Sequence, residues 1–290
     1  MVTPRSIAIV LLAYLLVASL IGCGKETERE EASSTEEFRI PDSLLAPLQG
    51  YKLTRDDYHP INGGVMENAE IVLHYPASAI ARYVAVKTFG MARIGLRTVI
   101  ERIGKPADGK ITLIGSKDLD EYKFLTRKEW WYYGVIQGDT IYFEPYDIMI
   151  KRGIAQMGIT QRMAQMALGR ISNDRLPLWM RESVASYVAG EGEIVTIQVE
   201  EFKRQNWDID PSPETLERDL GTAEVRADTR IAFGAAFRML EKLLETSSIE
   251  DVLRFARMLG TGDSLDDASR EVFGCDYKTL IDRVRVDEDS

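Results

Sequence analysis

Two residue types that build many metal and nucleophilic sites are scarce in this chain. Its 290 residues include only two histidines, His59 and His74, and two cysteines. His59 stands in a Tyr-His-Pro turn context, and His74 lies within an apolar, strand-like run. A His-Glu-x-x-His motif, which places two zinc ligands on one face of a helix, cannot be written anywhere. The conventional metallopeptidase motif is therefore excluded.

Positive charge is also in deficit. Lysine and arginine number 36 against 46 acidic residues, for a net charge of -10. Phosphate binding needs a basic face, so nucleic acid is not an expected partner. The same balance offers no argument for adhesion to an anionic bilayer through basic patches. A hydrophobic content of 45% is nevertheless enough for a real core, in one large domain or two smaller ones.

Several other chemical motifs are missing. Gly90, Gly95 and Gly104 are scattered in or after one expected helix and form no phosphate-binding loop. The Gly-x-Ser-x-Gly pattern of serine hydrolases does not occur, and the acidic run 263–267 lacks the spacing of a calcium loop. We therefore expect no cofactor.

The N-terminal segment carries the pattern of an exported protein. Arg5 supplies a positive start, and residues 7–20 form an apolar run that is short for a membrane-spanning helix. The run ends in Leu-Ile-Gly-Cys, which resembles the lipobox of bacterial lipoproteins. This resemblance implies a signal peptide over residues 1–22 and an acylated Cys23 that binds membrane lipid. An ordinary signal peptide, or an uncleaved anchor helix with a chance cysteine, is the alternative.

Residues 23–37 are interpreted as the lipidated cysteine and a disordered tether. From residue 25 to residue 37 no apolar side chain is larger than alanine, so this stretch cannot bury surface. Gly24 follows Cys23 where an aspartate would signal inner-membrane retention. The expected location is thus the cell envelope, by default the outer membrane of a two-membrane cell. With Cys23 acylated, Cys275 lacks an intrachain partner and is interpreted as a small packing residue.

Residue patterns divide the remainder into a lead-in (38–65, with one short strand), a sheet with two further helices (66–192) and a helical subdomain (193–290). The predicted fold class is α+β, with a small mixed sheet and a long helix packed on it. Strands are expected over 70–75, 110–115, 132–137 and 140–144, the last two joined by a tight turn at Gly138 and Asp139. Helices are expected from a Ser78 cap to Ile103, over 118–125, 154–170, 176–191 and 194–205, from a Ser212 cap to Leu220, and over 227–245, 248–259, 264–273 and 277–284.

The helix pair in 154–191 carries the most specific pattern. Residues 176–187 read Leu-Pro-Leu-Trp-Met-Arg-Glu-Ser-Val-Ala-Ser-Tyr. This resembles the Leu-Pro-x-Trp-Leu-x-Glu-Gly-Leu-Ala-x-Tyr segment of gluzincin metallopeptidases, specifically their peptidase MA-like domains, and the resemblance runs over about residues 66–285. It implies a zincin fold in which two former active-site helices pack together. In the family the glutamate matching Glu182 is the third zinc ligand.

The preceding helix departs from that family at each chemical position. Where the family has His-Glu-x-x-His, this chain has Gln161, Arg162 and Gln165. An amide oxygen is a poor zinc ligand, and a guanidinium cannot accept a proton at working pH. We therefore expect no metal and no catalytic residue, and treat these three positions and Glu182 as vestigial.

A buried Glu182 would still need a positive partner, because an unpaired buried carboxylate is costly. We hypothesise that Arg162 pairs with Glu182, with Gln161 and Gln165 hydrogen-bonding around them. The alternative is that Arg162 and Glu182 are solvated surface residues.

A dense aromatic run precedes the expected hairpin. Trp130, Trp131, Tyr132 and Tyr133 are interpreted mainly as core plus sheet edge, with the lining of a peptide or glycan groove as the alternative. The residues before them, 127–129, are expected to be a solvated loop.

Together these patterns predict a membrane-anchored lipoprotein with an inactive peptidase-like domain that binds a protein or peptide, or assists envelope assembly. A hydrolase with an atypical or metal-free site, and a lipid-anchored spacer without a cleft function, are the alternatives.

Overall fold

The computed structural model describes residues 63–76, 79–192, 213–222 and 226–285, all within one compact unit, Tyr51–Ser290. Several expectations lie outside these residues. They are the signal peptide, Cys23 and its tether, most of the lead-in, His59, the Ser78 and Ser212 caps, and the helix over 194–205.

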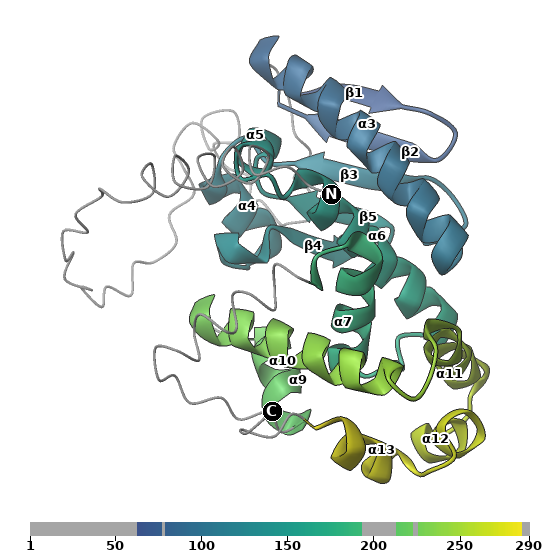
Figure 1. Cartoon of the computed structure of the whole chain (residues 1–290). Coiled ribbons are helices and arrows are strands. Elements are labelled where there is room, and N and C mark those ends of the chain that lie inside the picture. Colours follow the sequence, from purple (N-terminus) through teal and green to yellow (C-terminus); the bar gives the residue numbers. More distant parts are fainter. Residues whose placement is uncertain (1–62, 77–78, 193–212, 223–225, 286–290) are drawn as a thin grey trace, which may run out of the picture. The chain divides into compact units, whose positions relative to one another are not determined.

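A mixed five-stranded sheet forms one layer (Figure 1). Its order is β1-β2-β3-β5-β4; β2, β3 and β5 run parallel, and β1 and β4 are antiparallel edge strands. The predicted mixed sheet is thus confirmed, and the lead-in's short strand is β1. The strands are β1 (Gly64–Glu67), β2 (Ile71–Tyr75), β3 (Ile111–Gly115), β4 (Gly134–Gln137) and β5 (Thr140–Phe143).

Helix α3 (Ala79–Arg102) is the long helix that the periodicity predicts. One of its faces is buried and includes Ala85, Ala92 and Val99, and the helix contacts β1, β2, α5 and α6. It stops before Gly104, whose φ of 134° is strained for residues with a side chain. The amide of Gly104 donates to the carbonyl of Val99, which closes the last turn.

Two local expectations are wrong. The strand expected from Tyr132 begins only at Gly134, because Trp130–Tyr132 form a 3-10 turn. The hydroxyl of the buried Tyr122 in α4 (Leu119–Thr126) donates to the Tyr132 carbonyl at 2.9 Å and holds this turn against α4. A short helix that was not expected, α5 (Tyr146–Lys151), follows Pro145.

The C-terminal half is helical, as predicted. Helix α10 packs on α7 and α11 packs on α6, so these helices share one hydrophobic core with the sheet layer. Ser248 and Asp251 form a reciprocal capping box at the start of α11. Cys275 is half-buried against this core, which agrees with its interpretation as a packing residue. The helices are α9 (Pro213–Thr222), α10 (Arg226–Leu244), α11 (Ile249–Thr261), α12 (Leu265–Phe273) and α13 (Tyr277–Val284).

Candidate functional site: a cleft with a buried ionic floor

Helices α6 (Ala155–Ser172) and α7 (Leu178–Ala189) are the predicted helix pair. The chain leaves α6 through Asn173, whose φ of 53° reverses its direction toward α7. Trp179 is fully buried, and its ring nitrogen donates to the Tyr277 hydroxyl at 3.0 Å. Helix α6 packs between α3, α7 and α11, so almost its whole circumference is buried. Polar side chains on α6 must therefore find partners inside the protein.

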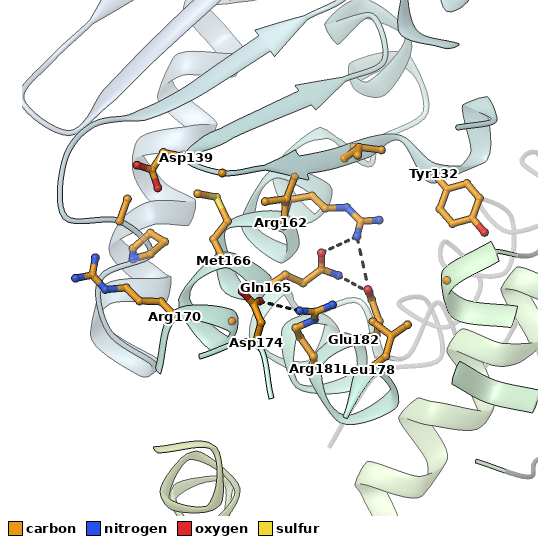
Figure 2. A pocket seen from close by; sticks show the side chains of 18 of the residues that line it. Tyr132, Asp139, Arg162, Gln165, Met166, Arg170, Asp174, Leu178, Arg181 and Glu182 are labelled. Carbon is orange, nitrogen blue, oxygen red and sulfur yellow. Dashed lines mark hydrogen bonds and ion pairs between the residues drawn. The ribbon is translucent and has the colours of Figure 1, made fainter. Parts of the chain in front are cut away.

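Arg162 and Glu182 lie close together in this interior. The Nη1 atom of Arg162 is 3.8 Å from Oε2 of Glu182 and donates to Oε1 of Gln165 at 2.7 Å. The side-chain amide of Gln165 in turn donates to Oε2 of Glu182. Figure 2 shows the Arg162 and Glu182 side chains pointing toward one another with Gln165 between them. The hypothesised pairing is present, and Gln165 bridges it.

Burial controls the ionisation of this group. It raises the pKa of Glu182 above its ordinary value, although Arg162 and Arg181 act in the opposite direction. Burial by itself would lower the pKa of Arg162, but Tyr133 and Glu182 more than offset it, so the guanidinium stays protonated. The Arg162 guanidinium also lies 4.9 Å from the centre of the Tyr133 ring.

Gln161 belongs to a second polar cluster, so its expected place beside the Arg162–Glu182 pair is wrong. Its amide donates to the Ser186 hydroxyl at 2.8 Å, and its side-chain oxygen accepts from the Tyr133 hydroxyl. Tyr133 and Ser186 also donate to the two carboxylate oxygens of Glu191, at 3.2 and 3.4 Å. Gln161 and Gln165, which the resemblance places where the family has two histidines, thus belong to different clusters.

Glu191 is a buried carboxyl that the sequence patterns did not identify. Gly190, with a φ of 78°, ends α7 and lets the Glu191 amide donate to the Ser186 carbonyl. This turn folds the Glu191 side chain back beneath the helix. Burial, opposed by Arg162 and by hydrogen bonds from Tyr133 and Ser186, raises the pKa of Glu191 to about 7.

A cleft of about 690 Å³ opens above the Arg162–Glu182 pair. Strand β4 forms one wall through residues 134–136, and α6 and α7 form the floor and the other wall. Gly138, Asp139, Lys128 and Tyr132 also line the cleft, and Figure 2 shows Asp139 and Tyr132 at opposite sides of the view. Arg162, Gln165 and Glu182 all line the cleft. The cleft therefore combines a strand edge with a polar floor.

The backbone of β4 has one unpaired side. The Glu144 amide donates to the Tyr133 carbonyl at 3.0 Å, which makes these two residues a hydrogen-bonded pair. Hydrogen-bonded and non-bonded pairs alternate along an antiparallel ladder. Gly134 and Ile136, one and three residues further on, consequently direct their N–H and C=O groups away from β5. Within the part of the chain that the structure describes, no hydrogen bond uses these groups.

The aromatic run is distributed over different environments. Tyr132 lines the cleft, and the Tyr133 hydroxyl lies in the Glu191 cluster. Trp130 and Trp131 contact each other edge to face at 5.9 Å but do not line the cleft. The solvated loop expected before them is partly wrong, because the half-buried Lys128 donates to the Gly221 carbonyl at 2.7 Å.

This arrangement does not fit a zinc ion. A guanidinium donates to Gln165 and lies 3.8 Å from Glu182, where it would repel a divalent cation. Gln161 is directed to Ser186 and Tyr133 instead. Among the residues with described positions, no group of three or more His, Cys, Asp or Glu side chains is arranged to hold a metal.

Comparisons of the chain with family models, with curated proteins and with solved structures found no match. None of the helices that the structure describes is both long enough and apolar enough to cross a membrane.

The Arg162–Glu182 pair generates a stability prediction. Arg162→Met should lower the free energy of unfolding by about 3–5 kcal/mol, because it leaves Glu182 buried without a cation. The double variant Arg162→Met/Glu182→Gln should recover most of that loss, because no buried charge then remains. Denaturant unfolding of the wild type, both single variants and the double variant gives the coupling energy. Strictly additive effects would show that the two side chains do not depend on one another.

Glu191 should make stability depend on pH. Its pKa is raised from 4.5 to about 7, so the folded state binds this proton more tightly than the unfolded state. The contribution is complete below pH 4.5 and is lost as the pH rises through about 7. Across that window the free energy of unfolding of the wild type should fall by about 3 kcal/mol relative to Glu191→Gln, which carries no charge. Parallel pH profiles of the two proteins would contradict the assignment.

Proposed function

We propose that this chain is a membrane-anchored lipoprotein of the cell envelope whose peptidase MA-like domain is catalytically inactive. The domain binds an extended segment of a protein or peptide in the cleft between β4, α6 and α7. The observation that carries this proposal is the unpaired edge of β4 beside a cleft whose floor is a buried Arg162–Gln165–Glu182 network.

The gluzincin likeness is supported by the helix pair. Residues 176–187 resemble the family's pattern, with departures at Met180, Ser183 and Val184, and Gln165 of α6, at the position of the second family histidine, donates to Glu182 of α7. A mixed sheet whose edge strand runs beside the first of these helices agrees with this likeness.

The lack of catalysis follows from side-chain chemistry. Arg162 occupies the position of the family's general base but stays protonated beside Glu182. Glutamine side chains are too weakly basic to replace the two imidazole ligands. The residues that would activate water are thus engaged in holding the interior together.

Binding is supported by the backbone chemistry of β4. The N–H and C=O groups of Gly134 and Ile136 can accept an added strand, as in proteins that bind peptides by β-strand addition. Main-chain hydrogen bonds would supply affinity with little dependence on peptide sequence, and the cleft's side chains would add selectivity. Arg170 and Arg181 together with Asp139 and Asp174 give the cleft charges of both signs.

One observation favours the alternative of a metal-free hydrolase. Glu182 lines the cleft, and burial raises its pKa above the ordinary value, so it takes up a proton more readily than a solvated glutamate. Its proximity to Arg162 and Gln165 argues instead for a structural role, and the peptide experiment below separates the two functions.

Restoring the family's residues tests the gluzincin likeness. The triple variant Gln161→His/Arg162→Glu/Gln165→His should retain one zinc ion per chain after dialysis, as measured by elemental analysis. Adding Glu182→Ala should weaken zinc binding by at least about ten-fold, because it removes the third protein ligand. A triple variant that keeps the wild-type circular dichroism but retains no zinc would contradict the likeness and leave peptide binding untouched.

Peptide binding should depend on the free edge of β4. Fluorescent peptides selected from a random eight-residue library on the wild-type protein should bind Ile136→Pro about 5–10-fold more weakly, as measured by anisotropy. The proline removes one outward N–H group without breaking a bond to β5. Ile136→Val keeps that group and is the matched control.

The same peptides distinguish binding from hydrolysis. Mass spectrometry should recover them intact after long incubation with the wild type. Cleavage that disappears in Glu182→Ala would establish the hydrolase instead. Selection of no binding peptide, or equal affinity of Ile136→Pro and Ile136→Val, would reject the β4 edge as the binding site.

A further inference from the structure

Helix α3 has an exposed face whose charge is opposite to that of the chain. The helix contains five basic residues and one acidic residue, although the whole chain has a net charge of -10. All six side chains are exposed. The basic residues are Arg82, Lys87, Arg93, Arg97 and Arg102, and the acidic one is Glu101.

Apolar side chains lie along the same face. Tyr83, Val86 and Ile94 are 64%, 54% and 55% exposed, and they are among the most exposed large apolar residues that the structure describes. At about 100° per residue, Ile94 and Gly90 each point within about 20° of Tyr83, and Gly90 lies between the other two along the helix axis. Lys87 and Arg97 flank this line by about 40° on either side, Val86 lies about 60° from it, and the exposed Glu101 lies in line with Tyr83 near the end of the helix. The face is thus a short apolar ridge formed by Tyr83 and Ile94, with one cation close on either side and Glu101 at its C-terminal end.

These cations are not committed to ion pairs. Within residues 63–76, 79–192, 213–222 and 226–285, none of the five has an acidic partner within 4 Å. Lys87 instead lies over the Tyr83 ring, 5.0 Å from its centre. By contrast, Lys110 close by pairs with Glu67 at 2.9 Å. Long, unpaired basic side chains beside apolar ones can extend toward an anionic surface while the apolar groups enter it.

We propose that this face of α3 docks on the surface of an anionic phospholipid bilayer. A helix with an apolar ridge and basic borders lies in the plane of such an interface, with apolar side chains in the headgroup boundary and cations on lipid phosphates. The complementary charge selects the bilayer as occupant, because each basic residue near an anionic leaflet adds favourable free energy. The overall negative charge does not prevent this, since screening limits the interaction to about 10 Å.

Docking through α3 would leave the cleft accessible. The opposite face of α3 packs on α6 and on β1 and β2, and no residue of α3 lines the cleft. A lipid anchor at one point of the chain does not fix which side of the domain faces the lipid, whereas a second membrane contact does. The inference uses the proposed lipid anchor only to bring α3 near the bilayer, and it does not depend on peptide binding.

The test places an environment-sensitive NBD fluorophore at residue 90, through Gly90→Cys in a Cys275→Ser background. A Cβ at residue 90 meets nothing within 4 Å, so the label should not disturb the fold. The full acylated chain is reconstituted into two kinds of vesicle. One contains phosphatidylcholine alone, and the other also contains about 30% phosphatidylglycerol, which makes its surface negative. A label at the exposed Arg257 of α11 serves as the reference.

The expected result is a blue shift at residue 90, and quenching by a lipid-borne quencher, only in anionic vesicles. The shift should disappear at about 1 M salt, where the screening length falls to about 3 Å. Neutralising four α3 cations should lower the ratio of docked to undocked domains by about 100-fold or more. Neutralising four exposed cations of α11 and α13 changes the net charge equally and should leave docking intact. The α3 variant carries glutamine at Arg82, Lys87, Arg93 and Arg97, and the control carries it at Arg254, Arg257, Lys278 and Arg283.

Three outcomes would overturn the proposal. The label at residue 90 could sense water in both vesicle types, or the two charge variants could behave alike. The label at residue 90 could also become shielded from water only when a soluble acidic protein is added, which would make α3 a protein-docking surface. Flotation of the vesicles separates these outcomes from failure of the lipid anchor, because a chain without the anchor would not float with zwitterionic vesicles.

Discussion

The need to pair a buried charge organises the centre of this molecule. Arg162 and Glu182 are both removed from water, and each would be costly alone. Their proximity, bridged by Gln165, ties α6 to α7 directly beneath the cleft. A second cluster around Glu191 satisfies Gln161, Tyr133 and Ser186. The four residues Gln161, Arg162, Gln165 and Glu182 therefore work as polar connections inside an otherwise apolar interior.

This arrangement connects packing with function. Because Arg162 and Gln165 are held by Glu182, the cleft floor is pre-organised, and the adjacent β4 edge keeps backbone groups available for a ligand. A polar floor beside an unpaired strand edge agrees with the proposed recognition of an extended chain.

The net charge of the whole chain does not describe the charge of the exposed face of α3. The net charge of -10 argues against a basic surface, yet α3 gathers five cations around an apolar ridge. Helical spacing alone places these residues together, but only the burial of the opposite face against α6 and the sheet shows that they remain outside. The proposed bilayer contact depends on that division of one helix into two faces.

Periodicity and capping residues were sufficient to predict most elements. The α3 periodicity, the Gly138–Asp139 turn and the Ser248 cap each act within a few residues, so the sequence alone determines them. It also gave the hypothesis that Glu182, if buried, would pair with Arg162, because a buried carboxylate requires a cation. Tertiary structure alone decided that Gln161 turns to Ser186, that Glu191 is buried beneath α7, and that Tyr132 stays outside β4. These outcomes depend on contacts between segments distant in the chain, which determine burial and hydrogen-bond partners and which no local pattern encodes.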